Sequence, residues 1–179
     1  ATTVLRYLFS HFLTNQQNKW RSKQVAKKHY NLGNKLYRHM LGDNMAYTCG
    51  YWKNADNLEA AQNAKYDLIC RKMQLQAGET VLELGCGWGG FAIEAAKQTG
   101  CRVTGITLSK EQKDEADLRI RAAGLEERVD IQLIDYRNLS GQYSKIVSIE
   151  MIEAVGHEFL PDYFSKINNQ IGRASCRER

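Results

Sequence analysis

The sequence lacks most of the features that place a chain in a special class. Its 179 residues include no apolar run of the roughly 18 residues that a membrane-spanning helix needs, and proline occurs once, at Pro161. The five cysteines contain no C-x-x-C pair, so the sequence indicates neither a disulfide framework nor a zinc site. There is also no initiator Met and no signal-peptide pattern. We therefore expect a soluble cytoplasmic domain without a bound metal, in a chain that is a piece of a longer protein.

Acidic residues are missing from the start of the chain, where the first is Asp43. The basic residues before it are Arg6, Lys19, Arg21, Lys23, Lys27, Lys28, Lys35 and Arg38. A cluster of one charge sign indicates an anionic partner, either a membrane surface or a nucleic acid. The charge alone fits a solvated helical face equally well.

Residues 1–22 predict an amphipathic and basic helix. Apolar side chains recur there with helical spacing, at Leu5, Leu8, Phe9, Phe12 and Leu13. Trp20 and the basic cluster follow directly, and this composition is typical of a helix that lies in a membrane interface. The alternative is that the apolar stripe packs on the domain itself.

Beyond this helix the chain alternates between strand and helix patterns, which predicts a parallel sheet covered on both faces. We expect strands near Val81–Leu84, Arg102–Ile106, Val129–Ile134 and Lys145–Ile149. Helices are expected near Asn57–Leu75, Gly90–Gln98, Ser109–Ala123 and Glu158–Asn168. Residues 23–76 would form a helical lid and residues 77–171 a cofactor-binding core.

Local signals predict where these helices begin and end. Asp56 with Glu59, and Ser109 with Gln112, have the spacing of capping pairs. Gly100 and Gly124 stand where the next two helices should end, because glycine readily adopts the left-handed conformation of a helix terminus.

A fifth strand would be expected in the last eight residues, 172–179. These residues are mostly basic or small and show no periodic pattern of apolar side chains. We therefore expect the sheet to be truncated at its C-terminal side.

The stretch VLELGCGWGGF, residues 81–91, carries glycines at Gly85, Gly87 and Gly90 and bends a strand into a helix around a nucleotide. A dinucleotide site would need an acid about 20 residues later to hold the ribose, and residues 105–109 contain none. Glu83, next to the turn, favours a cationic ligand such as S-adenosylmethionine. Asp135 could then accept a hydrogen bond from the adenine amino group.

The chain resembles the cyclopropane-fatty-acyl-phospholipid synthases and their mycolic-acid-modifying relatives. The resemblance extends over about residues 23–171. Its motifs are HYNLGN (29–34), YTCGYW (47–52), LELGCGWGG (82–90), TLSKEQ (107–112), DYR (135–137) and MIEAVGH (151–157). It implies the Rossmann-like fold of class I S-adenosylmethionine-dependent methyltransferases, with helices added before the first strand.

It also implies methyl transfer to a cis double bond in an acyl chain of a membrane phospholipid, forming a cyclopropane with bound bicarbonate as the base. The implied cofactor contacts are Tyr47, Thr48, Leu82, Glu83, Leu84, Gly85, Cys86, Gly87, Trp88, Gly89, Gly90, Thr107, Leu108, Ser109, Gln112, Asp135, Tyr136 and Arg137. Cys49 and Glu153 match positions that hold the bicarbonate, and Tyr30 matches an aromatic that faces the reacting carbon. We therefore expect a peripheral enzyme on an anionic membrane surface, to which the amphipathic and basic N-terminus would bind.

The residue types suit this chemistry. An alkene needs alignment with the methyl donor more than activation, an aromatic face such as Tyr30 stabilises the developing cation, and a weak base suffices for its acidic proton. Taken singly, each residue could have a structural role instead. Tyr30 could be a core residue, Cys49 a small buried hydrophobic residue, and Glu153 an acidic residue in the first turn of a helix. Ala154 departs from the family, whose members often have His there, and the rest of the bicarbonate site falls outside this chain.

Four alternatives remain open. The same cofactor could serve a sphingolipid or a small-molecule amine, and amine methylation would need no base for a carbocation. The chain could instead be an inactive cofactor- or membrane-binding module. A nicotinamide oxidoreductase is disfavoured by the missing acid near Thr107, and no motif supports nucleic-acid methylation.

Overall fold

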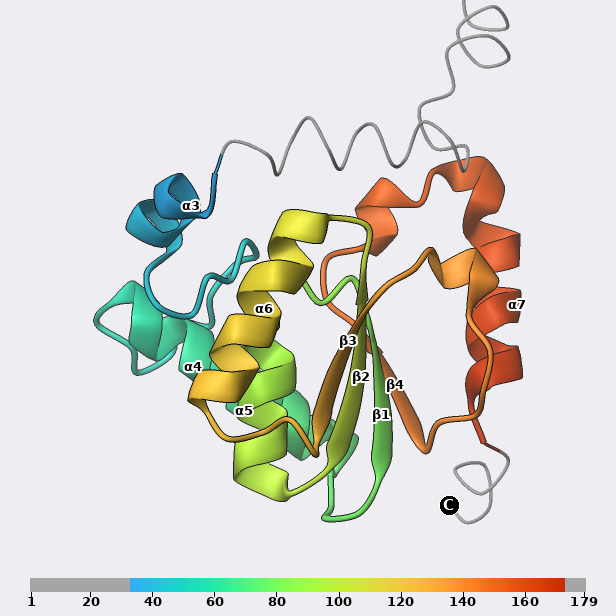
Figure 1. Cartoon of the computed structure of the whole chain (residues 1–179), viewed down its shortest axis with the longest axis horizontal. Coiled ribbons are helices and arrows are strands. Elements are labelled where there is room, and N and C mark those ends of the chain that lie inside the picture. The colour runs from blue at the N-terminus through green and yellow to red at the C-terminus, as the bar shows by residue number, and fades with distance from the viewer. Residues whose placement is uncertain (1–32, 173–179) are drawn as a thin grey trace, which may run out of the picture.

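The computed structural model describes residues 33–172, which are built around a four-stranded parallel sheet (Figure 1). Its strands are β1 (Thr80–Leu84), β2 (Arg102–Thr107), β3 (Val129–Leu133) and β4 (Lys145–Ser148), in the order β3-β2-β1-β4. In the register, Leu82 of β1 lies opposite Thr104 on one side and Ile146 on the other. The expected parallel sheet is confirmed, and each expected strand end lies within one residue of the observed one.

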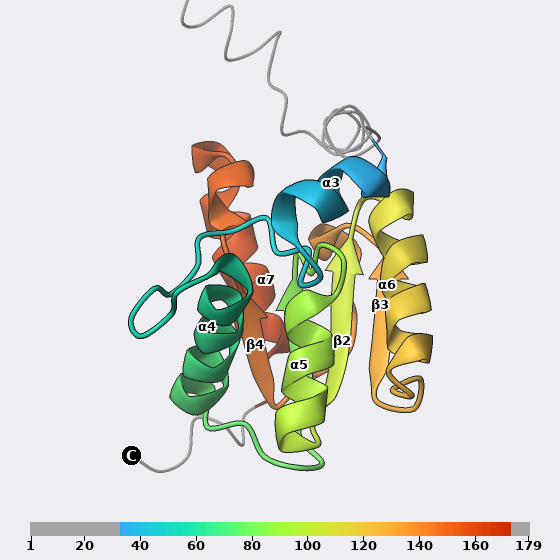
Figure 2. The ribbon, with the colours of Figure 1, turned by 90° about the vertical axis from the view of Figure 1, so that its left-hand side faces the viewer.

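Helices cover both faces of the sheet (Figures 1 and 2). On one face lie α4 (Leu58–Met73), α5 (Gly90–Thr99) and α6 (Lys110–Ala122), and on the other lies α7 (Leu160–Gln170). Side chains alternate along β1, so Val81 packs with the first group of helices while Leu82 and Leu84 pack with α7. Short 3₁₀ turns complete the chain: η1 (Tyr136–Asn138), η2 (Ile152–Ala154) and η3 (His157–Phe159).

The helix termini follow the predicted signals with one correction. The Ser109 hydroxyl accepts from the amide of Gln112, as expected, and Gly100 ends α5 in the left-handed conformation. The cap of α4 is Asn57, whose side chain accepts from the amide of Ala60 at 2.9 Å, and not Asp56. Asparagine and aspartate cap equally well, and the helix begins one residue later than the pair Asp56–Glu59 requires.

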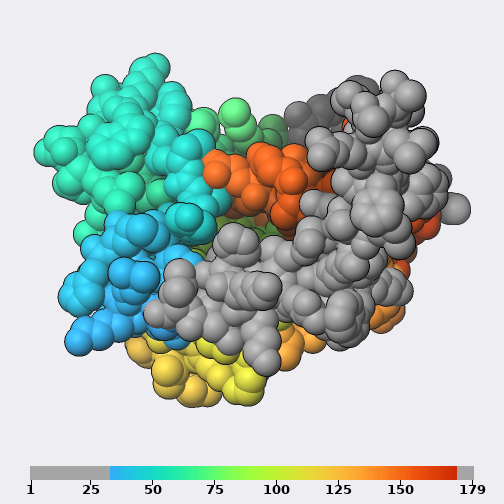
Figure 3. Space-filling view, turned by 90° about the horizontal axis from the view of Figure 1, so that it is seen from above, coloured from blue at the N-terminus to red at the C-terminus, as the bar shows by residue number. Residues whose placement is uncertain are grey.

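One helix was not specifically expected: α3 (Asn34–Leu41). It is held by contacts distant in sequence: the indole N–H of Trp88, in the loop after β1, donates to the Asn34 side-chain oxygen at 2.9 Å, and the Asn34 side-chain amide donates to the Glu111 carbonyl of α6 at 3.3 Å. Viewed onto the carboxyl ends of the strands, the segment that follows α3 lies beside the segment that follows β4 (Figure 3). These two segments border the site described below.

The first residue after α7 forms an isolated bridge. Ile171 forms a parallel bridge with Tyr143, just before β4. The predicted helix over residues 1–22 and all but the first residue of the predicted tail lie outside the described residues, so both stay predictions, as does the division at residue 77. Within residues 33–172, no helix is both long and apolar enough to cross a bilayer.

Candidate active site

A cavity of about 630 Å³ opens at the carboxyl ends of β1, β2 and β4. Parallel sheets bind ligands at this edge, where the loops that follow the strands diverge. The lining residues are Met45, Ala46, Tyr47, Thr48, Tyr66, Glu83, Gly85, Cys86, Gly87, Trp88, Gly90, Phe91, Ile106, Thr107, Leu108, Ser109, Gln112, Ile134, Asp135, Tyr136, Arg137, Ile149, Glu150, Met151, Ala154 and Val155. They come from six segments of the chain, so the cavity depends on the fold as a whole.

The glycine-rich loop forms the floor of the cavity. Gly87 has a φ of 54°, and a Cβ built on it would meet no atom within 4 Å, because it would project into open space. A Cβ on Gly90 would instead lie 2.6 Å from the Tyr66 hydroxyl. Gly87 therefore leaves room for a ligand to approach the backbone, whereas Gly90 lets α5 approach α4.

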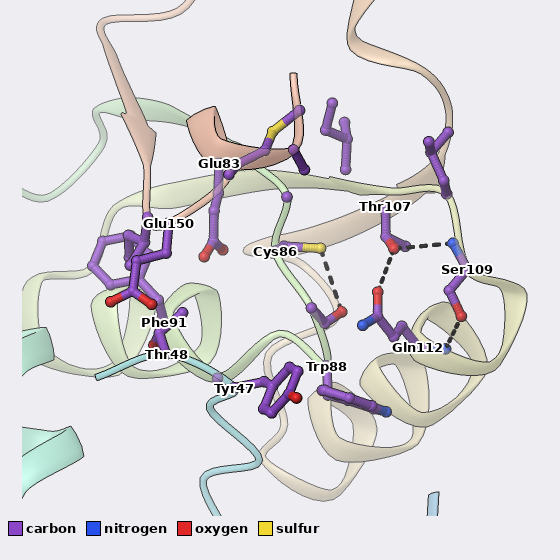
Figure 4. A pocket seen from close by; sticks show the side chains of 18 of the residues that line it. Tyr47, Thr48, Glu83, Cys86, Trp88, Phe91, Thr107, Ser109, Gln112 and Glu150 are labelled. Carbon is purple, nitrogen blue, oxygen red and sulfur yellow. Dashed lines mark hydrogen bonds between the residues drawn. The ribbon is translucent and has the colours of Figure 1, made fainter. Parts of the chain in front are cut away.

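Glu83 places a carboxyl group inside the cavity (Figure 4). Its side chain is 3 % exposed, and its Oε2 atom has no hydrogen-bond partner among the described residues. Burial raises the pKa of Glu83 to about 8, although the amide of Ala92 and the charge of Lys65 oppose the rise. A buried carboxyl with an unsatisfied oxygen facing an open cavity is suited to a cationic ligand.

A polar network lies where β2 ends (Figure 4). The Thr107 hydroxyl donates to the side-chain oxygen of Gln112 at 2.6 Å and accepts from the amide of Ser109 at 3.1 Å. All three residues are buried, and the network fixes the turn into α6. The segment contains no carboxylate that faces the cavity, as the sequence indicated.

Asp135 and Arg137 form an ion pair at the end of the cavity formed by β3. Both oxygens of the buried Asp135 accept from Arg137, at 2.8 Å from Nε and 2.6 Å from Nη2. The pair also holds the Arg137 guanidinium over the rings of Tyr136 and Phe159. Asp135 is thus held in place by a neighbour, and its predicted contact with adenine stays a prediction.

The segment Met45–Cys49 forms one wall and is held by α4. The Gln62 side-chain amide donates to the carbonyls of Thr48 at 2.8 Å and Ala46 at 3.4 Å. The ammonium of Lys65, one helical turn further, donates to the Thr48 hydroxyl. Side chains of α4, and not sheet hydrogen bonds, therefore position this wall.

Glu150 connects this wall to the opposite one. It lies directly beyond β4, with a left-handed φ of 50°, and its two carboxylate oxygens accept from the Cys49 amide at 3.0 and 3.3 Å. Its carboxylate is in the cavity near Thr48 (Figure 4). The hydrogen bond and negative charge of Glu150 raise the pKa of the Cys49 thiol, so the geometry gives no support for a nucleophilic thiolate.

The structure brings most of the predicted cofactor residues together around the cavity. The exceptions are Leu82, Leu84 and Gly89, which do not line it. Glu153 is exposed and does not line the cavity. Cys49 does not line it either, but its amide donates to Glu150, which does. Tyr30 lies outside the described residues. The role of each residue stays a prediction.

Sequence reasoning missed several residues of the site. Lys65 and Tyr66 carried no motif, and the signal that could have found them is the buried face of α4, to which Gln62 also belongs. Glu150 stood next to the MIEAVGH motif but was not singled out, because no local pattern indicates that it meets Cys49.

Comparison with known proteins gives concordant results. A family model described as mycolic acid cyclopropane synthetase matches residues 16–175. Over 159 residues the chain is 46% identical to the cyclopropane-fatty-acyl-phospholipid synthase of Escherichia coli (strain K12), an alignment that covers 89% of this chain and 41% of that protein. The chain thus spans less than half the length of that relative.

Two solved structures show the same arrangement. Mycolic acid cyclopropane synthase CmaA1, complexed with SAH (S-adenosylhomocysteine) and CTAB, superposes with a TM-score of 0.80 at 30% identity, over 84% of this chain and 53% of that one. Coclaurine N-methyltransferase, bound to N-methylheliamine and SAH, gives a TM-score of 0.77 at 30% identity, over 84% of this chain and 44% of the other. Both structures therefore contain the same product of methyl transfer.

Proposed function

The chain belongs to the mycolic acid cyclopropane synthetase family, and from that premise we propose that it is the cofactor-binding part of a lipid-modifying methyltransferase. The proposed enzyme transfers a methylene unit from S-adenosylmethionine to the cis double bond of unsaturated acyl chains in membrane phospholipids. Its fold is the Rossmann-like fold of class I S-adenosylmethionine-dependent methyltransferases, as the sequence predicted.

The single observation that carries the proposal is the cavity with the Glu83 carboxyl inside it. S-adenosylmethionine has an ammonium and a sulfonium and no phosphate, which suits a cavity that contains a buried carboxyl group with an unsatisfied oxygen. Gly87 leaves space for close backbone approach, and the Thr107 network offers polar groups on the opposite side. These features fit the cofactor.

When bound, the cofactor supplies an electrophilic methyl group on sulfur. The residues of this chain then have to orient the two reactants, because an alkene is a weak nucleophile and alignment supplies most of the rate gain. The wall held by Gln62 and Lys65 and the loop at Gly87 fix two sides of the cavity. Apolar lining from Phe91, Ile149 and other residues excludes water from a developing carbocation.

We propose further that the enzyme acts on an anionic membrane surface as a peripheral protein. Support comes from the basic N-terminal region of the sequence and from large apolar side chains exposed on α3 and beyond it. Tyr47 is 59 % exposed and Trp52 is 54 % exposed, and Leu36 and Met40 are about half exposed. Aromatic and apolar side chains of this kind are typical of contacts with acyl chains at an interface.

A second candidate function is methylation of a small-molecule amine. The observation that favours it is the similarity to coclaurine N-methyltransferase, whose TM-score is close to that of CmaA1. The two candidates differ in what must happen after methyl transfer, since only ring closure removes a proton from carbon.

The test uses the full-length protein. It would be incubated with labelled S-adenosylmethionine and vesicles of unsaturated or saturated phospholipid, or with an amine acceptor. We expect the unsaturated acyl chain alone to gain one CH₂. Parallel calorimetry should show binding of S-adenosylhomocysteine and none of NAD. Methylation of the amine alone would support the second candidate, and binding of NAD alone would refute both.

A further inference from the structure

Arg119 of α6 joins two segments of the chain that border the cavity. Its Nη1 atom donates to the Trp88 carbonyl of the glycine-rich loop at 2.7 Å. Its Nη2 atom donates to the carbonyls of Asp43 and Asn44 at 2.9 and 3.3 Å. These two residues come directly before the wall Met45–Cys49. One side chain therefore connects the floor of the cavity to one of its walls.

The contact with Trp88 holds the turn that presents Gly87 to the cavity. The amide of Gly89 donates to the Cys86 carbonyl at 2.9 Å and so closes this turn. The Trp88 carbonyl belongs to the same peptide unit as the Gly89 amide, and a trans peptide directs these two groups in opposite directions. The two hydrogen bonds together therefore fix the plane of that peptide. Arg119 thus supports the loop at the point where a ligand can approach its backbone.

Aromatic packing connects the same two segments a second time. The ring centroid of Trp88 lies 4.8 Å from that of Tyr37 in α3, and the centroid of Tyr37 lies 5.8 Å from that of Tyr47 in the wall. Trp88 and Tyr37 are buried. Trp88 and Tyr47 both line the cavity (Figure 4). The loop and the wall are therefore joined by packed rings as well as by the guanidinium, which makes a contiguous path for coupling between them.

A guanidinium suits this position better than an ammonium does. Its N–H groups lie in one plane at fixed angles, so Nη1 and Nη2 of Arg119 can serve two segments at once. Hydrogen bonds from a charged donor are also stronger than those between neutral groups. Arg119 is partly buried, so replacing it would remove a donor from three carbonyls in a place with limited access to water.

We propose that Arg119 is a positioning residue that couples binding of the methyl donor to the placement of the wall. The inference rests on the proposed function, because the methyl donor is the ligand concerned. Arg119 does not line the cavity. It acts on Gly87 through the peptide of Trp88, and on Tyr47 through the backbone that precedes the wall. A ligand that orders the loop therefore also orders the wall, and a wall already in place raises the affinity for the ligand by the same factor.

The experiment follows amide hydrogen exchange in the full-length protein, with and without S-adenosylhomocysteine as the probe. In the unchanged protein, saturating ligand should slow exchange in residues 43–49 and in residues 86–89. In Arg119→Gln it should slow exchange in residues 86–89 alone, and the affinity measured by calorimetry should fall about tenfold. A residue with a purely structural role would lower stability but would leave the two segments responding together.

Two further variants complete the design. Arg121→Gln makes the same chemical change at an exposed position of the same helix, and it should alter neither affinity nor exchange. Arg119→Lys keeps the positive charge but not the forked geometry, so it should stay uncoupled. It also replaces Arg119→Gln if that variant does not fold.

Three outcomes would overturn the proposal. If the ligand slows exchange in both segments of Arg119→Gln, as in the unchanged protein, Arg119 does not couple them. The same conclusion follows if the ligand slows exchange in only one segment of the unchanged protein, a result that needs no variant. Full coupling and affinity in Arg119→Lys would assign the effect to charge alone. If the unchanged protein binds no S-adenosylhomocysteine, the proposed function itself fails, whereas binding without coupling overturns this inference alone.

Discussion

Cofactor binding to this protein should depend on pH through Glu83. The carboxyl group is buried, one of its oxygens has no partner, and its pKa is raised from an ordinary 4.5 to about 8. At neutral pH the unliganded protein therefore holds Glu83 mostly protonated. A ligand with an ammonium group favours the ionised form, so its binding releases a proton.

The magnitude follows from the size of the shift. Below a pKa of about 8, the ionised fraction of Glu83 rises about tenfold per pH unit, so affinity for S-adenosylhomocysteine should rise about tenfold between pH 6 and pH 7. The ligand's amino group remains largely protonated in that range. Because folding raises the pKa of Glu83 above its ordinary 4.5, the protonated carboxyl group contributes to the stability of the fold. That contribution is fully present below pH 4.5 and is lost as pH rises through about 8. At 1.36 kcal/mol per pKa unit, the shift from 4.5 to about 8 limits this loss in the free energy of unfolding to about 5 kcal/mol.

Calorimetry in two buffers of different ionisation enthalpy measures both the affinity and the protons released. We expect up to one proton per ligand at pH 7 for the unchanged protein and none from this group for Glu83→Gln, whose affinity should vary little between pH 6 and pH 7. Glu127→Gln serves as the control and should behave like the unchanged protein. Identical pH dependence in Glu83→Gln and the unchanged protein would refute the assignment of the titrating group.

Three further substitutions separate folding from binding. Gly90→Ala should lower the free energy of unfolding by about 2–3 kcal/mol in urea titrations, because the new Cβ would lie 2.6 Å from the Tyr66 hydroxyl; unchanged stability would show that α4 and α5 can separate. Gly87→Ala should lower the free energy of unfolding by about 1 kcal/mol, because the φ of Gly87 is 54°. In calorimetry it should also weaken S-adenosylhomocysteine binding by at least about tenfold. Unaltered affinity would argue that no ligand approaches this loop. Asp135→Asn should cost about 2 kcal/mol in the free energy of unfolding, because it removes the ionic partner of Arg137; a loss confined to binding would mean that the pair serves the ligand alone.

Much of the fold was predictable because its signals are local. Gly85 and Gly87 mark a strand that turns into a helix, and the hydroxyl of Ser109 caps a helix three residues from its partner. Such patterns depend on neighbouring residues and need no knowledge of the rest of the chain. The mistaken cap at Asp56 shows the limit of this reasoning, since Asn57 offers the same chemistry one residue later.

The site was less predictable because its decisive contacts join distant segments. Cys49 and Glu150 are separated by 101 positions in the sequence, and their hydrogen bond depends on where β4 places the chain. Asn34 meets Trp88 across 54 positions, and this contact fixes α3, a helix too short to be identified with certainty from its pattern. Tertiary packing, and not local preference, brings these residues together.

The left-handed backbone at Glu150 has a consequence for how this protein would respond to engineering. A residue with a Cβ in that conformation costs about 1–2 kcal/mol, which glycine would avoid. Natural proteins retain such costs where activity needs them, and stabilising substitutions at those places often reduce activity. A laboratory search for heat-resistant variants would therefore be drawn to position 150, and the variants it selected there would lose the carboxylate that accepts from the Cys49 amide across the cavity.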